Sequence, residues 1–158
     1  MAALRSIAQS VGTASVSERT NLVLGDLQAT VLRVTRLRHD DQGRPIVLEK
    51  VVLPLDRFPG LVPNGDHTSD IVKLAQRYGF SPGRATERVS NVPATSEIAS
   101  HLEIAHGADV MRLDRVIRTN DGAPIEWRVA YCVQSTNSAP LKHKLGDAQT
   151  PGVADLDQ

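Results

Sequence analysis

The sequence predicts an α+β domain built on a mainly antiparallel sheet, and three features of the 158 residues support this. Two pairs of β-branched, apolar runs are each joined by a short polar turn, as in β-hairpins. Two short segments between these pairs carry apolar residues at helical spacing. Hairpins, rather than strand–helix–strand crossovers, therefore connect most strands, which favours antiparallel pairing with the helices on one side of the sheet.

Two hairpins are predicted, one towards each end of the folded region. In the first, an apolar run is followed by a polar turn at residues 39–44 and a partner strand. In the second, the Asp121-Gly122 step supplies the positive φ that a tight turn needs. The strands of the two hairpins are residues 27–38, 45–53, 109–119 and 124–134.

Two helices and a further strand are predicted between the hairpins. The first helix begins at an N-cap, Thr68 or Ser69, and ends at Gly79. A strand over residues 84–92 and a short helix over residues 93–104 follow. The apolar side of the first helix consists of Ile71, Leu74, Ala75 and Tyr78.

The chain length suits one domain with tails. Residues 1–25 are expected to form a short helix, from the spacing of Leu4, Ile7, Ala8 and Val11, followed by a loose Ser/Thr segment. Residues 26–140 are the predicted folded unit, and residues 141–158 are an expected disordered tail because they contain little apolar mass. No internal repeat is evident in the sequence.

Composition excludes several classes of protein. The net charge is zero and the pI is about 7.0, which argues against nucleic-acid binding by bulk electrostatics. No apolar run reaches the roughly 18 residues of a membrane helix, and the first residues contain no apolar stretch typical of a secretory signal. Cys132 is the only cysteine, which excludes an internal disulfide and a multi-cysteine zinc site. These observations predict a cytoplasmic protein without a membrane partner.

Three charged residues lie on apolar strand faces. Glu49, Glu87 and Arg115 each have mostly apolar neighbours two positions away along a strand. A buried charge without a partner costs several kcal/mol, so each must meet an opposite charge or a ligand. Two interpretations stay open: Arg115 pairs with Glu49 or Glu87 inside the fold, or these residues line a binding cavity.

Arg36 and Arg38 share one face of the first predicted strand, near its turn. Two guanidinium groups two strand residues apart, about 6.6–7 Å, can converge on one anionic group. The alternative is a solvated strand end, which is the more common origin of an isolated Arg-x-Arg.

Signatures of catalysis are weak. Cys132 lies in an apolar strand with no histidine nearby in sequence, which indicates a packed thiol rather than a nucleophile. His101 and His106 are poorly spaced for a metal, and the sequence contains neither a glycine-rich phosphate loop nor a nucleophile elbow. The chain is therefore expected to be neither an enzyme nor a metal- or cofactor-binding protein.

The order of short segments along the chain is similar to that of a known family. They are Arg36-Leu37-Arg38, the turn from Asp41 to Ile46, Glu49, Leu53-Pro54, Phe58-Pro59-Gly60-Leu61, Tyr78-Gly79, Ala85-Thr86-Glu87, Ala99 with Leu102, Gly107, Leu113-Asp114-Arg115-Val116, and Asp121-Gly122-Ala123-Pro124-Ile125-Glu126-Trp127 to Tyr131. Together they resemble the UTRA domain, the effector-sensing half of HutC-type GntR transcription regulators. The resemblance covers residues 26–131.

The resemblance implies a chorismate-lyase-like fold, with an antiparallel sheet and flanking helices around a small-molecule pocket. It also implies that the arginine pair Arg36 and Arg38 binds a phosphate or carboxylate. Glu49 would accept hydrogen bonds from the ligand, and Ser69 would provide a hydroxyl at the start of the first helix. Two residues of the last strand are further candidates, although strict alternation places them on opposite faces. With Arg115 from the strand-face pattern, the candidate ligand-binding residues are Arg36, Arg38, Glu49, Ser69, Arg115, Glu126 and Tyr131.

The predicted function is that of a non-catalytic sensor for a small anionic effector, such as a phosphorylated sugar or an amino-acid-related acid. Ile71 stands where sugar-phosphate sensors of the family often have an aromatic residue, which argues against that ligand. The resemblance also implies a homodimer that contacts DNA only through a winged helix-turn-helix, for which residues 1–25 are too short. The alternatives are a chorismate-lyase-like enzyme and a ligand-free dimerisation module.

Overall fold

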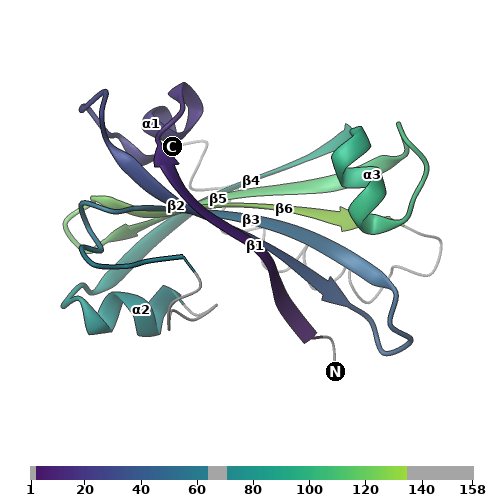
Figure 1. Ribbon diagram of the computed structural model, residues 1–158, viewed down its shortest axis with the longest axis horizontal. Helices are drawn as coiled ribbons and strands as arrows, with labels where there is room; N and C mark the ends of the chain where they lie inside the picture. Colours follow the sequence, from purple (N-terminus) through teal and green to yellow (C-terminus); the bar gives the residue numbers. More distant parts are fainter. Residues whose placement is uncertain (1–2, 64–70, 135–158) are drawn as a thin grey trace.

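The described part of the chain folds into an antiparallel six-stranded sheet with three short helices (Figure 1). The computed structural model describes residues 3–63 and 71–134. The strands lie in the order β1-β2-β3-β6-β5-β4. They are β1 (Ala3–Thr13), β2 (Thr30–His39), β3 (Pro45–Pro54), β4 (Pro82–Pro93), β5 (Asp109–Thr119) and β6 (Pro124–Val133). The helices are α1 (Val16–Leu22), α2 (Ile71–Arg77) and α3 (Ser96–Leu102).

The predicted α+β class is confirmed, and both hairpins form where the sequence places them. The expectation that the helices lie on one side of the sheet is wrong. Helix α1 and helix α3 cover one face, whereas α2 covers the other (Figure 1). The packing agrees, because Leu74 of α2 joins a core with Val51 of β3, while Leu22 of α1 joins one with Val52. Successive residues of a strand point to opposite faces, so Val51 packs on the side of α2 and Val52 on the side of α1.

The first 25 residues differ most from the prediction. Residues 3–13 form β1, which pairs with β2 along its length, so the sheet begins before residue 26. A bulge between Ser6 and Ala8 makes Ile7 an extra residue, and the extra residue gives the apolar positions a spacing that imitates a helix. The expected loose segment instead contains α1. The predicted tail at residues 141–158 lies outside the described residues.

The capping of α1 explains why a helix forms within this Ser/Thr-rich segment. Ser15 and Glu18 form a capping box, in which each side chain accepts a hydrogen bond from the other residue's backbone N–H. Glu18 also receives hydrogen bonds from Arg33 of β2, with Nε at 2.7 Å from Oε2. Local capping and a tertiary ion pair therefore hold α1 on the sheet.

The structure contains an internal repeat that the sequence does not reveal. The unit β1-α1-β2-β3 is matched by β4-α3-β5-β6, and the two units meet where β3 pairs with β6. Ser15 and Thr95 are the two N-caps, and Val23 and Glu103 are the two left-handed C-caps. Cap positions and turn glycines recur, whereas most surface side chains differ, so similarity at the level of residue types is lost.

Candidate functional site

Six charged side chains gather on the face of the sheet that α2 covers. Strand pairing places Arg36 opposite Glu49, and Arg115 opposite both Arg128 and Glu87. Four of the six are buried, with exposed fractions of 5% for Arg36, 6% for Glu49, 8% for Glu87 and 2% for Glu126. We refer to these six residues as the charged cluster: Arg36, Glu49, Glu87, Arg115, Glu126 and Arg128.

Four members of the charged cluster form a chain of ion pairs. Arg36 Nη2 lies 2.7 Å from Glu49 Oε1, and Arg128 Nη1 lies 3.5 Å from Glu49 Oε2. Arg128 Nη2 donates a hydrogen bond of 3.0 Å to Glu126 Oε2. Burial lowers the pKa of Arg36, and the Glu49 carboxylate opposes this shift. The chain of alternating charges therefore stabilises four ions in a region with little access to water.

Arg115 is placed differently from the other two arginines. Within the described residues, no carboxylate oxygen lies within ion-pair distance of its guanidinium, and its buried Nε has no hydrogen-bond partner. Burial lowers the pKa of Arg115, and the Arg128 guanidinium lowers it further. Burial likewise raises the pKa of Glu87, while Arg115 acts in the opposite direction. The expected pairing of Arg115 with Glu49 or Glu87 is therefore not found.

Arg36 and Arg38 share a face but differ in environment. Arg36 is held in the ion pair with Glu49, whereas Arg38 is exposed near the turn between β2 and β3. Cys132 is a buried free thiol, as predicted. Burial raises the pKa of Cys132 to about 11, and Arg38 opposes that shift. Arg38 is thus a solvent-accessible cation near the buried thiol of Cys132.

The two candidates from the last strand separate. Glu126 belongs to the charged cluster, whereas Tyr131 lies on the opposite face because β6 pairs without a bulge between Glu126 and Val133. Its ring lies 5.8 Å from the Arg112 guanidinium, on the face that α3 covers. Tyr131 is therefore not a neighbour of the cluster, and Ser69 lies outside the described residues.

Arg128 is a member of the charged cluster that the sequence analysis missed. It alternates with Glu126 and Ala130 along an apolar strand, the same signal that identified Glu49, Glu87 and Arg115. In residues 3–63 and 71–134, no three His, Cys, Asp or Glu side chains come together as a metal-ligand set. The arrangement is suited to binding a polar molecule through arginine and glutamate.

Comparison with known families identifies the domain. The family model of the UTRA domain matches residues 5–136. The chain belongs to the UTRA domain family. The match begins within β1, in agreement with the structure, and confirms the resemblance seen in the sequence.

Solved structures similar to this UTRA domain are parts of GntR-family regulators. A GntR-family regulator from Enterococcus faecalis is 27% identical, with a TM-score of 0.71 over 82% of this chain and 92% of that chain. The ligand-binding domain of a putative GntR-family regulator from Bordetella bronchiseptica is 25% identical, with a TM-score of 0.75 over 85% and 86%. The effector domain of PhnF from Mycobacterium smegmatis is 26% identical, with a TM-score of 0.73 over 84% and 80%. The fold is thus the chorismate-lyase-like fold of these effector domains.

A curated relative supports the same assignment. The HTH-type transcriptional regulator Rv0792c of Mycobacterium tuberculosis is 29% identical over 118 residues, which make up 72% of this chain and 43% of the relative. The chain thus spans less than half the length of that regulator. Across the described part of the chain, none of the helices has the length and apolar character needed to cross a membrane. The UTRA domain is a regulatory effector-binding domain of the GntR-family type.

Proposed function

We propose that this UTRA domain binds a small anionic effector at the charged cluster and belongs to a HutC-type regulator. In the full-length regulator, effector binding changes the spacing of paired DNA-binding heads, which lie on a winged helix-turn-helix outside this chain. Such coupling requires the effector to bind one arrangement of the heads more tightly than the other. Homodimerisation and DNA binding are part of this proposal.

The observation that carries the proposal is the state of Arg115. The ion pairs use Glu49 and Glu126 to compensate Arg36 and Arg128, and no carboxylate in the described ranges lies within ion-pair distance of Arg115. Arg115 is half-buried with a fully buried Nε, and a cation removed from water is costly unless it is paired and hydrogen-bonded. A phosphate or carboxylate next to Arg115 would give it the close ion pair that the described residues do not form, which is why an anion is the class of ligand that fits.

The remaining members of the cluster would orient the effector. The Arg36 Nε and Glu126 Oε1 atoms are buried and lack hydrogen-bond partners among the described residues, so they can contact polar groups of a ligand. Glu49 positions Arg36 rather than standing free. Arg38 offers a second, exposed cation at the rim. By resemblance to the family, Ser69 is also proposed as an anion contact.

A thermal-shift screen of the 158-residue chain tests the proposal. The panel contains sugar phosphates, amino acids, dicarboxylates, phosphonates, acyl acids and chorismate, with inorganic phosphate and sulfate as controls. A ligand at 100 times its Kd adds about 2.7 kcal/mol of stability, which is a shift of several degrees for a domain of this size. We expect one class of organic anion to exceed both inorganic controls.

Two arginine variants connect any shift to the site. Arg115→Met should remove the shift, whereas Arg112→Met should retain it, because Arg112 pairs with Asp114 on the opposite face of the sheet. A screen with no response overturns effector binding and favours a ligand-free dimerisation module. Conversion of chorismate into a product would instead establish an enzyme.

A further inference from the structure

The sheet carries a groove on the face that α1 and α3 cover. In Figure 1 these two helices lie towards opposite ends of that face, with the centre of the sheet between them. A groove of about 500 Å³ lies there, and its lining includes Lys50 of β3 and Trp127, Val129 and Tyr131 of β6. It is on the opposite face from the charged cluster, because Val129 follows Arg128 along β6. We call it the central groove.

The internal repeat explains the position of the central groove. Strand β3 begins at Pro45 and β6 begins at Pro124, each directly after the turn of its hairpin. Five residues further along, Lys50 and Val129 are therefore counterparts in the two units. These counterparts also pair with each other across β3 and β6. The groove thus lies where the two units meet, between their equivalent helices.

An ion pair closes the side of the groove towards α3, and its counterpart is missing on the side towards α1. Lys50 Nζ lies 2.7 Å from Glu97 Oε1, so β3 is bridged to α3. Ser17 is the counterpart of Glu97, because each is the second residue after the N-cap of its helix. The equivalent bridge would join Ser17 to Val129, which cannot form an ion pair. Ser17 therefore lines an open space between α1 and β6.

The cations that line the central groove are already compensated. Arg33 Nε lies 2.7 Å from Glu18 Oε2, and Arg112 Nη2 lies 2.9 Å from Asp114 Oδ2. Lys50 has the ion pair with α3 described above. A charged ligand would have to break one of these pairs to gain a close ion pair of its own. A neutral molecule is therefore the class of ligand that fits the groove.

Two aromatic residues of β6 lie towards the two ends of the groove. Trp127 packs with the core beneath α1, and Tyr131 packs with the core beneath α3. Val129 lies between them on the same face and belongs to neither core. Trp127 Nε1 donates a hydrogen bond of 2.7 Å to Asp114 Oδ1, which holds the indole by its polar edge. Residues four apart on a strand are separated by about 13 Å, which is enough for one or two fused rings.

We propose that the central groove binds a neutral aromatic molecule of one or two rings, at a site separate from the effector site. The rings lie over Val129, in the space that the missing bridge leaves, and pack between Trp127 and Tyr131. Ser17 and Thr35 bring hydroxyl groups to the groove, which can bond a polar substituent of the ligand. The volume of about 500 Å³ is within the usual range of small-molecule sites.

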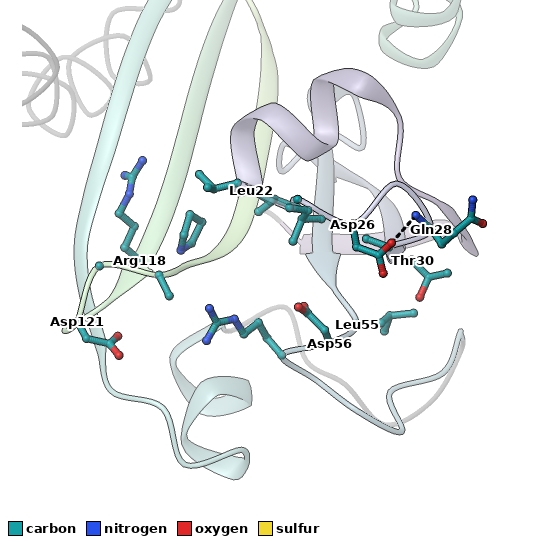
Figure 2. Close-up of a pocket in the computed structure, with 16 residues that line it drawn as sticks. Leu22, Asp26, Gln28, Thr30, Leu55, Asp56, Arg118 and Asp121 are labelled. Carbon is teal, nitrogen blue, oxygen red and sulfur yellow. Dashed lines mark hydrogen bonds between the residues drawn. The ribbon is translucent and has the colours of Figure 1, made fainter.

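A larger hollow of about 650 Å³ differs from the central groove in character (Figure 2). Its walls are mainly the loop after α1, the loop after β3 and the β5–β6 hairpin. In Figure 2, Asp26, Asp56 and Asp121 border it together with Arg118. None of the described residues that line it is aromatic. This hollow therefore provides a control site for the same ligand.

Quenching of Trp127 fluorescence tests the proposal directly, because Trp127 is the only tryptophan of the 158-residue chain. The probes are neutral 4-nitrobenzyl alcohol and 4-nitrobenzoate, an anion of similar shape. We expect saturable quenching by the neutral probe and a Kd at least about tenfold higher for the anion, or about 1.4 kcal/mol. Free N-acetyltryptophanamide, titrated in parallel, corrects for collisional quenching and for absorption by the probes.

A double variant closes the groove without disturbing the fold. Ser17→Glu combined with Val129→Lys reproduces, towards α1, the bridge that Lys50 and Glu97 form towards α3. Its melting temperature should stay within a few degrees of wild type, while the Kd of the neutral probe should rise at least about tenfold. Tyr131→Val is a second, independent variant, which removes one aromatic wall and should raise the Kd about threefold or more.

Gln28→Lys is the matched control, because it adds a lysine to the larger hollow and should leave the Kd unchanged. Quenching by the neutral probe that does not saturate overturns the proposal. So does an unchanged Kd in both Tyr131→Val and the folded double variant, or a raised Kd in Gln28→Lys. An equal or lower Kd for 4-nitrobenzoate overturns the neutral class of ligand. None of these variants lies in the charged cluster, so a failure here leaves the effector proposal intact.

Discussion

Arg115 and Arg128 lie directly opposite each other on β5 and β6, on the same face of the sheet. At the equivalent positions of the first unit, Arg36 faces Glu49, and the two side chains are 2.7 Å apart. The second unit therefore has two cations at the positions where the first unit has an ion pair. Arg128 is compensated by Glu49 and Glu126, whereas Arg115 faces Glu87 of β4 without an ion pair.

Replacing Arg115 by methionine should leave the ligand-free domain as stable as before, or more stable by about 1 kcal/mol. Arg115 forms no ion pair within the described residues, so replacing it by an apolar side chain of similar length removes the cost of desolvating its charge. Urea denaturation measures this change. A loss of more than about 2 kcal/mol would mean that Arg115 has a structural partner and that the cluster is complete without a ligand.

Glu49→Ala should be strongly destabilising, by about 3–5 kcal/mol, because it leaves Arg36 as a buried cation without its partner. Denaturant midpoints at constant slope give the difference. Lys50→Ala is the matched control, since Lys50 is the next residue of β3 and pairs with Glu97 at the surface. The control should lose less than about 1 kcal/mol. Similar losses in both variants would contradict the assigned role of the buried pair.

Glu18 should make the stability of the domain depend on pH. Burial acts to raise its pKa, but hydrogen bonds from Arg33 and Ser15 outweigh burial and hold the pKa below its ordinary value of 4.5. A lowered pKa stabilises the folded state above the unfolded-state pKa, and this contribution is lost as pH falls through the folded-state value. The Glu18→Gln substitution should lower the free energy of unfolding by about 1 kcal/mol at neutral pH.

The comparison is made from urea denaturation across a pH series. The curves for wild type and Glu18→Gln should begin to converge as the pH falls below the ordinary pKa of 4.5 and should meet below the lower folded-state pKa. A constant difference at every pH would show that Glu18 stabilises α1 through shape or capping rather than through its charge.

Gly83→Ala should destabilise the junction between β4 and the β5–β6 hairpin. A Cβ at this position would lie 2.9 Å from the backbone oxygen of Thr119, closer than real Cβ atoms approach such atoms. The hairpin is tied to the start of β4 by the hydrogen bond from Asn120 N to Ser81 O, at 3.0 Å. We expect a loss of about 1–3 kcal/mol, measured by thermal or urea unfolding.

Gly25→Ala is the control for that variant. A Cβ on Gly25 meets nothing within 4 Å, so alanine should be tolerated or slightly stabilising. If both glycine variants unfold alike, the close approach at Gly83 has no energetic consequence.

The core of the fold was predictable because local patterns agree with the tertiary structure there. The Asp121-Gly122 turn, the apolar side of α2 and the alternation in β5 and β6 all appear where the sequence places them. The prediction was wrong for residues 3–13, because the bulge at Ile7 inserts one residue and disguises a strand as a helix. A bulge depends on pairing with β2, which is a non-local interaction.

The candidate site was predictable only in part. Alternation identified Glu49, Glu87 and Arg115 as charges on apolar faces, and the structure places them in one cluster. Alternation could not assign partners, because Glu49 meets Arg36 and Arg128 only when three strands lie side by side. It also placed Tyr131 on the face opposite Glu126, and the absence of a bulge between these two residues of β6 confirms that placement.

The sequence by itself determined the class of fold, the hairpins, the buried character of the charged strand residues and the family. These properties depend on local periodicity and turn chemistry, which operate over a few residues. Only the tertiary structure decided which charges compensate one another, which cation is left over, and that the two halves repeat. Ion pairing between distant strands is set by sheet order and register, so it exists only once the chain has folded.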